Sequence, residues 1–172
     1  GRREAAERAL EEFARPLART DWSTRSLEEQ GAALREELAL RGGLVGNEDD
    51  FYDPRNSFIP DVLERRRGIP ISLALVYIDV ARRVGITARG VGFPGHFLLR
   101  LDSNTDASKP PVLLDPFYGG RVATRAILTE LLARTGSPAD EIPEPLLAAV
   151  SSRSLLQRML MNLRNIFLHR AE

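Results

Sequence analysis

The sequence predicts an α+β fold built as a single domain, and three observations support this prediction. Apolar residues recur at helical spacing up to about residue 83. Three short apolar runs, 88–93, 97–101 and 112–115, then follow with turn residues between them, which is typical of a small antiparallel sheet. At 172 residues and 43% hydrophobic content, the chain can bury one substantial core.

Residues 1–44 form the predicted helical N-terminal part of this domain. Residues 2–15 place apolar side chains at helical spacing among charges. The segment Ser26-Leu27-Glu28-Glu29 has the form of a capping box, in which serine and glutamate side chains satisfy backbone N–H groups at a helix start. A second helix should therefore begin there, and the pair Gly42-Gly43 should end it.

Residues 45–135 form the predicted core. Gly, Asn, Asp and Pro are frequent in residues 44–57, which predicts a polar loop. Asn56 or Ser57 should then cap a short helix that contains Val62, Leu63 and Arg66.

A central, buried helix is predicted from Pro70 to about Gly85. Proline suits the first helical turn, where a backbone N–H would have no partner, and the apolar residues that follow cover most faces of the helix. Gly85 supplies a stop signal.

The second and third apolar runs should pair as a hairpin. Pro94-Gly95 and the polar loop 102–111 separate the three runs. If that loop is symmetric, His96 and Asp115 lie nearly opposite each other, where cross-strand side chains approach within about 5 Å. A one-residue slip or a bulge would undo this pairing.

The remaining chain is predicted to be mostly helical. A turn is expected at residues 116–120, and Thr124 should cap a helix that ends near Arg134. Residues 135–145 contain three prolines and should be irregular. The stretch 151–170 shows a wide apolar stripe at helical spacing and predicts an amphipathic C-terminal helix.

Ser72, His96 and Asp115 occur in this order at positions that should face one cleft. Ser72 lies at a predicted helix start, His96 follows the turn Pro94-Gly95, and Asp115 ends an apolar strand. A nucleophile at a helix start, with a base and its orienting carboxylate on neighbouring strands, is the arrangement of a hydrolytic triad. These three residues are the candidate catalytic site.

The segments around these positions resemble a known family. Arg65–Ala74 (RRRGIPISLA), Gly90–Phe97 (GVGFPGHF) and Leu114–Phe117 (LDPF) resemble, in this order, the bacterial SirB-type branch of the transglutaminase-like superfamily. A domain in a eukaryotic F-box protein is similar to the same sequence. The resemblance covers roughly residues 45–170.

The resemblance implies a papain-related fold in which helices pack on an antiparallel sheet and Cys, His and Asp form the site in that order. Position by position, the nucleophile falls on Ser72, the histidine on His96 and the carboxylate on Asp115. Serine or threonine in place of cysteine looks usual for this branch. Members often continue into tetratricopeptide-like repeats, so residues 154–169 are expected to lead toward a partner-binding repeat region of a longer protein.

Two functional hypotheses follow from the serine. In the first, the triad is degenerate and the domain is a non-catalytic binding or regulatory module for a protein or peptide. In the second, Ser72 is the nucleophile of acyl transfer or amide hydrolysis, His96 its general base and Asp115 the orienting residue. The Ser72 N–H and the Asn56 side chain would then be the oxyanion donors.

The chemistry of serine favours the first hypothesis. A cysteine ionises readily at a helix start beside a histidine, whereas a serine hydroxyl reacts only if a base removes its proton during attack. The simpler structural interpretation of Ser72 is a hydrogen bond within the first helical turn.

Composition argues against several other classes. Lys+Arg and Asp+Glu each total 24, so the excess of positive charge that nucleic acid or an anionic membrane would attract is absent. No cysteine and only two histidines are present, so neither a metal nor a cofactor is expected. No apolar run reaches the roughly 18 residues of a membrane span and no signal-peptide pattern opens the chain, so a cytoplasmic location is expected.

Three further features have alternative interpretations. The arginines at 65–67 and 82–83 could bind an anion, but a solvated helix face is the simpler interpretation. His169 is expected to be solvated. Five aromatic residues either line a pocket beside the triad or fill the core, and the core is favoured: Tyr52, Phe58, Phe93, Phe97 and Phe117.

Overall fold

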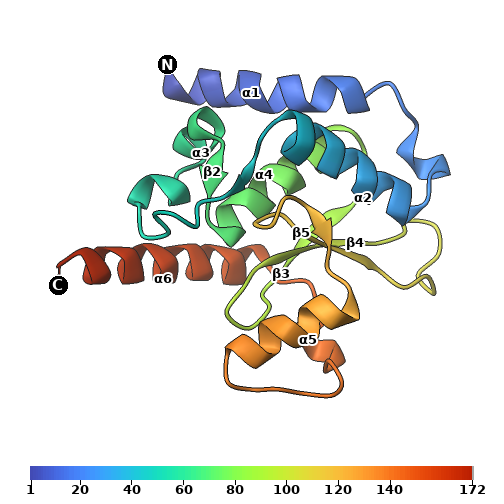
Figure 1. Cartoon of the computed structure of the whole chain (residues 1–172). Helices are drawn as coiled ribbons and strands as arrows, with labels where there is room; N and C mark the ends of the chain where they lie inside the picture. Colours follow the sequence, from blue (N-terminus) through green and yellow to red (C-terminus); the bar gives the residue numbers. More distant parts are fainter. Residues whose placement is uncertain (172) are drawn as a thin grey trace.

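The computed structural model describes residues 1–171 and shows a four-stranded antiparallel sheet between helices (Figure 1). The α+β class predicted from the sequence is confirmed. The helices are α1 Arg2–Leu17, α2 Leu27–Arg35, α3 Ile59–Arg65, α4 Pro70–Arg83, α5 Arg125–Arg134 and α6 Ser152–Ala171. Shorter helical segments are η1 Trp22–Thr24, η2 Glu36–Arg41, η3 Pro54–Ser57 and η4 Glu144–Leu147. The strands are β1 Val45–Gly46, β2 Arg67–Gly68, β3 Ala88–Val91, β4 Leu98–Leu101, β5 Val112–Asp115 and β6 Arg121–Val122.

The sheet has the order β3-β4-β5-β6, and helices cover both of its faces. Leu99 and Leu114, which pair directly, join the main core formed with α4, α2 and α1. Leu98 and Leu113 belong to a second core together with Leu128 of α5. Because successive side chains of a strand point to opposite faces, one short hairpin supplies both cores.

Helix α4 is the central element, as the sequence predicted. Pro70 is its first residue, and eight of its residues are buried, including Leu73 and Tyr77. The helix stops at Val84 and is followed by Gly85, whose positive φ of 81° a residue with a Cβ atom would adopt only with strain. Burial of each large apolar side chain stabilises the fold by about 2 kcal/mol, so α4 anchors the domain.

The predicted capping box at the start of α2 is present. Ser26 Oγ accepts a hydrogen bond from Glu29 N at 3.1 Å, and Ser26 N donates to Glu29 Oε2 at 2.9 Å. The helical path continues from α2 through the π-helical segment η2 and ends at Gly42, in agreement with the predicted stop.

The prediction for residues 44–66 was wrong in two respects. The loop contains two ordered elements: β1, which pairs with β2 in parallel, and η3. Neither Asn56 nor Ser57 caps the short helix, because α3 starts after Phe58, where no side chain caps it. The side chain that caps in this region belongs to Asp53, which accepts from Arg55 N at 2.9 Å at the start of η3.

The C-terminal part agrees with the predicted pattern. Thr124 Oγ1 accepts from Ile127 N at 3.4 Å and caps α5. Residues 137–143 are irregular, and η4 and then α6 follow. Among residues 1–171, no helix combines the length and the apolar character that crossing a bilayer requires.

Candidate functional site

A cleft of about 420 Å³ opens beside His96, where the start of α4, the turn before β4 and the turn after β5 meet. Pro70, Phe117 and Tyr118 form walls of this cleft together with His96. Two charged residues, Glu48 and Arg134, also line the cleft, and both are exposed. The cleft therefore combines an aromatic surface with one negatively charged and one positively charged side chain.

His96 and Asp115 form the pair that the hairpin predicted. His96 Nε2 lies 2.8 Å from Asp115 Oδ1. The ladder pairs Leu99 with Leu114, so His96 lies in the turn before β4, ahead of the paired residues. The side chains meet although the backbone positions are not directly opposite.

The carboxylate partner indicates which nitrogen of the His96 ring carries the proton. Opposite an ionised carboxylate, which only accepts hydrogen bonds, Nε2 is the protonated nitrogen and donates a hydrogen bond to Asp115 Oδ1. Nδ1 has no hydrogen-bond partner among residues 1–171 and keeps its lone pair when the ring is neutral. A histidine held in this way can accept a hydrogen bond through Nδ1.

Asp115 is a fully buried carboxylate that accepts hydrogen bonds from two side chains, those of His96 and Arg121. Its exposed fraction is 0%, and Arg121 NH2 lies 3.3 Å from Oδ2, on the opposite oxygen from His96. These contacts offset the cost of removing the charge from water. The pair is therefore part of the packed structure as well as of the cleft.

Ser72 is not brought to this pair. The side chain is fully buried, and Oγ donates to the backbone oxygen of Asn56 at 2.6 Å. The same Oγ accepts from Ile69 N at 3.1 Å, at the start of α4. The hydroxyl thus joins the helix start to the loop before α3, and no hydrogen bond connects it with His96 among the described residues.

Asn56 also has its polar atoms committed elsewhere. Its side-chain Nδ2 donates to the backbone oxygens of Asp50 at 2.8 Å and Phe51 at 3.2 Å. Its Oδ1 accepts from Asn47 Nδ2 at 3.0 Å. Neither amide proton of Asn56 is free to serve an oxyanion in this arrangement, so the structure gives this residue the role of closing the loop.

Pro70, and not Ser72, is the residue of α4 that lines the cleft with His96. The helix start therefore presents a side chain without a nucleophilic atom. The structure brings two of the three predicted residues together, whereas the third is fully buried and does not line the cleft.

The aromatic predictions divide into three outcomes. Phe93 and Phe97 are buried in the core, as favoured, whereas Tyr52 and Phe58 are about 40% exposed, at 41% and 45%. Phe117 is buried and also lines the cleft. Its ring meets the His96 ring edge to face, with centroids 6.0 Å apart.

Phe51 and Tyr118 complete this aromatic wall, although neither was singled out in the sequence. Phe51 contacts Phe117 edge to face at 6.0 Å between centroids. Tyr118 stacks on the His96 ring at 5.9 Å with an angle of 29° between the planes. A short Asp-Pro-Phe-Tyr segment that follows a strand carries little signal by itself, because only the fold shows which side chains surround the histidine.

Helix α6 contacts the turn that carries His96. Arg158 NH2 lies within hydrogen-bond reach of the backbone oxygens of His96, at 3.4 Å, and Phe93, at 3.5 Å. Burial lowers the pKa of the Arg158 guanidinium below its usual value. His169 is exposed, as expected, but its ring stacks on Tyr52 at 3.9 Å between centroids.

The arginines at 65–67 and 82–83 are largely committed within the protein. Arg65 pairs with Asp53 at 2.9 Å, and Arg83 pairs with Glu7 at 2.6 Å. The Arg66 guanidinium lies 4.6 Å from the centre of the Phe13 ring. The expectation of a solvated helix face therefore fits Arg82, which is 71% exposed, but not Arg65 and Arg83, which are 25% and 19% exposed and paired within the domain.

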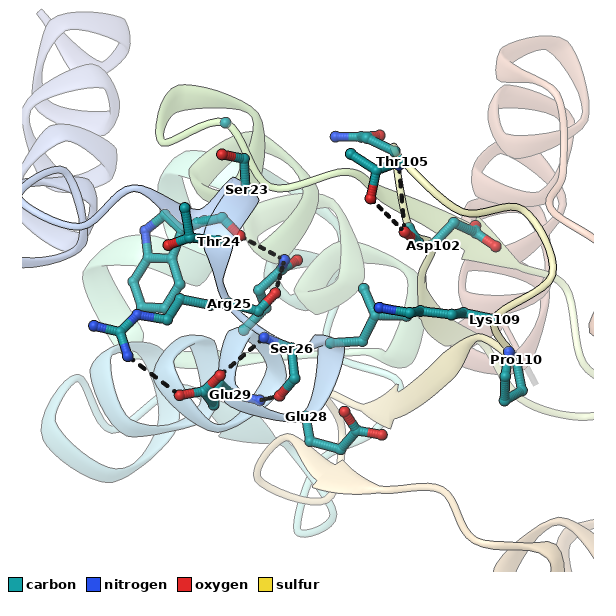
Figure 2. Close-up of a pocket in the computed structure, with 16 residues that line it drawn as sticks. Ser23, Thr24, Arg25, Ser26, Glu28, Glu29, Asp102, Thr105, Lys109 and Pro110 are labelled. Carbon is teal, nitrogen blue, oxygen red and sulfur yellow. Dashed lines mark hydrogen bonds and ion pairs between the residues drawn. The ribbon is translucent and has the colours of Figure 1, made fainter.

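A second cavity of about 590 Å³ lies between η1, the start of α2 and the loop after β4 (Figure 2). Its polar groups are used locally: the Ser26–Glu29 capping box forms one wall, and Gln30 Nε2 donates to the Trp22 backbone oxygen at 2.9 Å. None of the candidate residues lines it. Among residues 1–171, no group of three His, Cys, Asp or Glu side chains could hold a metal ion.

Comparison with known proteins identifies relatives of the chain. A family model described as "Transglutaminase-like superfamily" matches residues 4–161. A UPF0162 protein of Xylella fastidiosa is 42% identical over 140 residues, which cover 79% of this chain and 48% of the relative. A UPF0162 protein of Pseudomonas aeruginosa is 37% identical over 160 residues, 92% of this chain and 56% of the relative.

A eukaryotic relative is also found. F-box only protein 21 of Mus musculus is 33% identical over 125 residues, which cover 70% of this chain and 19% of that protein. The chain thus spans about half the length of the bacterial relatives and a smaller part of the F-box protein. No solved structure matches the chain significantly.

Proposed function

The chain belongs to the transglutaminase-like superfamily, and we propose that its domain is a non-catalytic binding module whose cleft recognises a peptide. The observation that carries this proposal is the hydrogen bond from Ser72 Oγ to the Asn56 backbone oxygen at 2.6 Å. A hydroxyl has one proton, and in this arrangement His96 does not receive it.

The alternative, acyl transfer or amide hydrolysis with Ser72 as nucleophile, needs three things that do not coincide here. The nucleophile must reach both the base and the substrate, and Ser72 is fully buried. A second donor must face the oxyanion, and the Asn56 amide is bound to Asp50 and Phe51. The His96–Asp115 pair meets only the third requirement, a general base, and leaves the accessible nucleophile and the second oxyanion donor without a candidate.

The composition of the cleft supports a peptide ligand. Pro70, Phe117 and Tyr118 offer flat apolar surfaces, and His96 Nδ1 offers an acceptor for a backbone N–H. Asp115 fixes the orientation of that acceptor through Nε2. Glu48 and Arg134 add one charge of each sign, which suits a polar chain better than a lipid or a fused-ring hydrocarbon.

Catalysis is tested with a fluorophosphonate probe and the variants Ser72→Ala and His96→Ala. A binding module should show equal background labelling in all three proteins, because Ser72 Oγ is not accessible. Labelling of the unmodified protein that disappears in both variants would overturn the proposal in favour of the serine enzyme.

Binding is tested separately by titrating the isotope-labelled protein with a mixture of capped tripeptides. Amide shifts should be confined to residues around the cleft, including His96 and Phe117, and should be lost in Tyr118→Ala. Arg25→Ala, in the second cavity, is the matched control and should leave the shifts unchanged. Absence of shifts at the cleft, or shifts that persist in Tyr118→Ala, would contradict a peptide-binding role.

A further inference from the structure

The outward face of α6 carries a continuous apolar stripe. Leu156, Leu160, Leu163 and Phe167 follow one another at spacings of four, three and four residues, which places them on one side of a helix with 3.6 residues per turn. Leu156, Leu160 and Phe167 are 57%, 59% and 58% exposed. Exposed apolar residues are ordinary when scattered, but here three exposed residues and the half-buried Leu163 lie in one row and form a contiguous surface.

The stripe is separate from the face that attaches α6 to the domain. Leu155 and Met159 pack on the cluster of Ile69, Ile71 and Phe97, and Ile166 is buried. The centre of this attachment face lies about a quarter turn around the helix from the centre of the stripe, and Leu163 lies on the side of the stripe nearest to it. Figure 1 shows α6 at the edge of the molecule, and the exposed fractions of Leu156, Leu160 and Phe167 show that the described chain leaves these side chains largely uncovered.

The charges around the stripe are of one sign. The helix contains arginines but no Asp or Glu from Ser152 to Ala171. Arg153 and Arg164 flank the stripe on one side and Arg170 on the other, and all three are exposed. Neither Arg153 nor Arg164 forms an ion pair with any other residue in the described range 1–171.

From this combination we infer that the outward face of α6 is a docking surface for an acidic amphipathic helix of a partner protein. Apolar anchors at spacings of three and four residues are how helices recognise one another, and the flanking arginines would pair with Asp or Glu beside the partner's own apolar row. This surface is distinct from the cleft, and the proposal does not depend on peptide binding there.

An anionic bilayer is the competing ligand for a basic amphipathic helix. The overall charge argues against it, because Lys+Arg and Asp+Glu balance at 24 each and leave no net attraction toward an anionic surface. The attachment of α6 along its length also fixes its inward face to the domain. A partner helix needs only the outward row.

The test uses fluorescence anisotropy with two labelled helical peptides of about 18 residues. Both carry leucines at the spacing of the stripe, one with glutamates and the other with lysines at all flanking positions. The acidic peptide should bind about tenfold or more tightly than the basic one, and the difference should shrink at high salt. Binding should be lost in Leu160→Ser combined with Phe167→Ser.

A control variant and three kinds of contradicting result complete this test. Leu40→Ser removes an exposed leucine elsewhere, 62% exposed in η2, and should leave binding unchanged. Equal affinity for both peptides, or no binding to either, would overturn the proposal. So would self-association that Leu160→Ser abolishes in sedimentation, which assigns the stripe to a second copy, or binding to phosphatidylglycerol vesicles that the same change abolishes, which assigns it to a membrane.

Discussion

Ser72 Oγ donates a hydrogen bond to the Asn56 backbone oxygen, 2.6 Å away, and this bond connects the start of α4 with η3, which precedes α3. Ile69 N, at the beginning of the same helix, donates to Ser72 Oγ at 3.1 Å and lies 3.4 Å from the same Asn56 oxygen. The three groups form a closed local network that does not include His96. Ser72 therefore has the structural role that was its simpler interpretation, with an added hydrogen bond to Asn56.

We expect Ser72→Ala to lower stability and to leave the cleft intact. Removing a buried hydroxyl whose partners remain in place costs about 1 to 2 kcal/mol in the free energy of unfolding. Chemical denaturation measures this loss. Ser57→Ala is the matched control: Ser57 Oγ is buried without a hydrogen-bond partner among residues 1–171, so its removal should be close to neutral. A neutral Ser72→Ala would show that the network contributes little.

Arg158 should hold the turn that carries His96. Its NH2 group approaches the backbone oxygens of Phe93 and His96, and its position leaves no space for a Cβ atom at Gly92, which would lie 2.5 Å from NH1. Arg158→Ala should therefore speed amide hydrogen exchange in residues 92–97 by about tenfold, because the turn loses its outer support. Arg153→Ala, on the exposed side of the same helix, should change nothing there. Unaltered amide hydrogen exchange in Arg158→Ala would show that the arginine packs against the turn without stabilising it.

Asp53 should make the domain sensitive to acid. The Arg55 side chain, followed by other contacts that include Arg65, lowers the pKa of this carboxyl group from 3.8 to about 2. A carboxyl whose pKa is lower in the folded state stabilises the fold above the unfolded pKa, and this contribution is lost as the pH falls. The free energy of unfolding should therefore decrease by about 1 to 2 kcal/mol between about pH 4 and pH 2 through this group.

Replacing Asp53 isolates that contribution. Asp53→Asn should be less stable at neutral pH and should show a shallower decline in acid, measured by urea denaturation at a series of pH values. Asp49→Asn, on an exposed residue of the same loop, should keep the pH dependence of the unmodified protein. An unchanged acid slope in Asp53→Asn would place the acid sensitivity in other carboxyl groups.

Tyr77 and Gly120 should behave as a coupled pair. A Cβ atom at Gly120 would lie 2.6 Å from the Tyr77 hydroxyl, and Gly120 has a φ of 68°. Gly120→Ala should therefore destabilise the domain by about 2 kcal/mol or more through strain and crowding. Tyr77→Phe should be neutral or slightly stabilising, because the buried hydroxyl has no partner among residues 1–171. The double variant should recover part of the loss, whereas strictly additive effects would exclude the contact.

The sequence predicted most elements because their signals are local. The capping box at Ser26, the proline at position 70 and the apolar strands each depend on neighbouring residues, and all appear in the structure. The hairpin also predicted the His96–Asp115 pair, since positions at nearly equal distances from the centre of the connecting loop lie close together across the two strands. The hydrogen bond of Ser72 within the first helical turn was also foreseen, but its bond to Asn56 could not be predicted in the same way. It depends on the Asn56 carbonyl, which reaches the helix only through the path of the intervening loop.

The sharpest prediction contrasts two positions at the start of α4. The chain contains no cysteine, so Pro70→Cys and Ser72→Cys each introduce a single thiol. Residue 70 lines the cleft with His96, whereas residue 72 is fully buried. A thiol in the first turn of a helix has a lowered pKa and reacts faster when it is accessible.

Iodoacetamide should therefore alkylate Pro70→Cys at least about tenfold faster than Ser72→Cys at neutral pH. Adding His96→Ala should slow the reaction of Pro70→Cys and leave that of Ser72→Cys unchanged, because only the first thiol shares the cleft with the imidazole. Circular dichroism of each variant checks that the helix persists. The reverse order, with a fast, His96-dependent thiol at position 72, would place the nucleophile position at Ser72 after all and would favour the serine enzyme over the binding module.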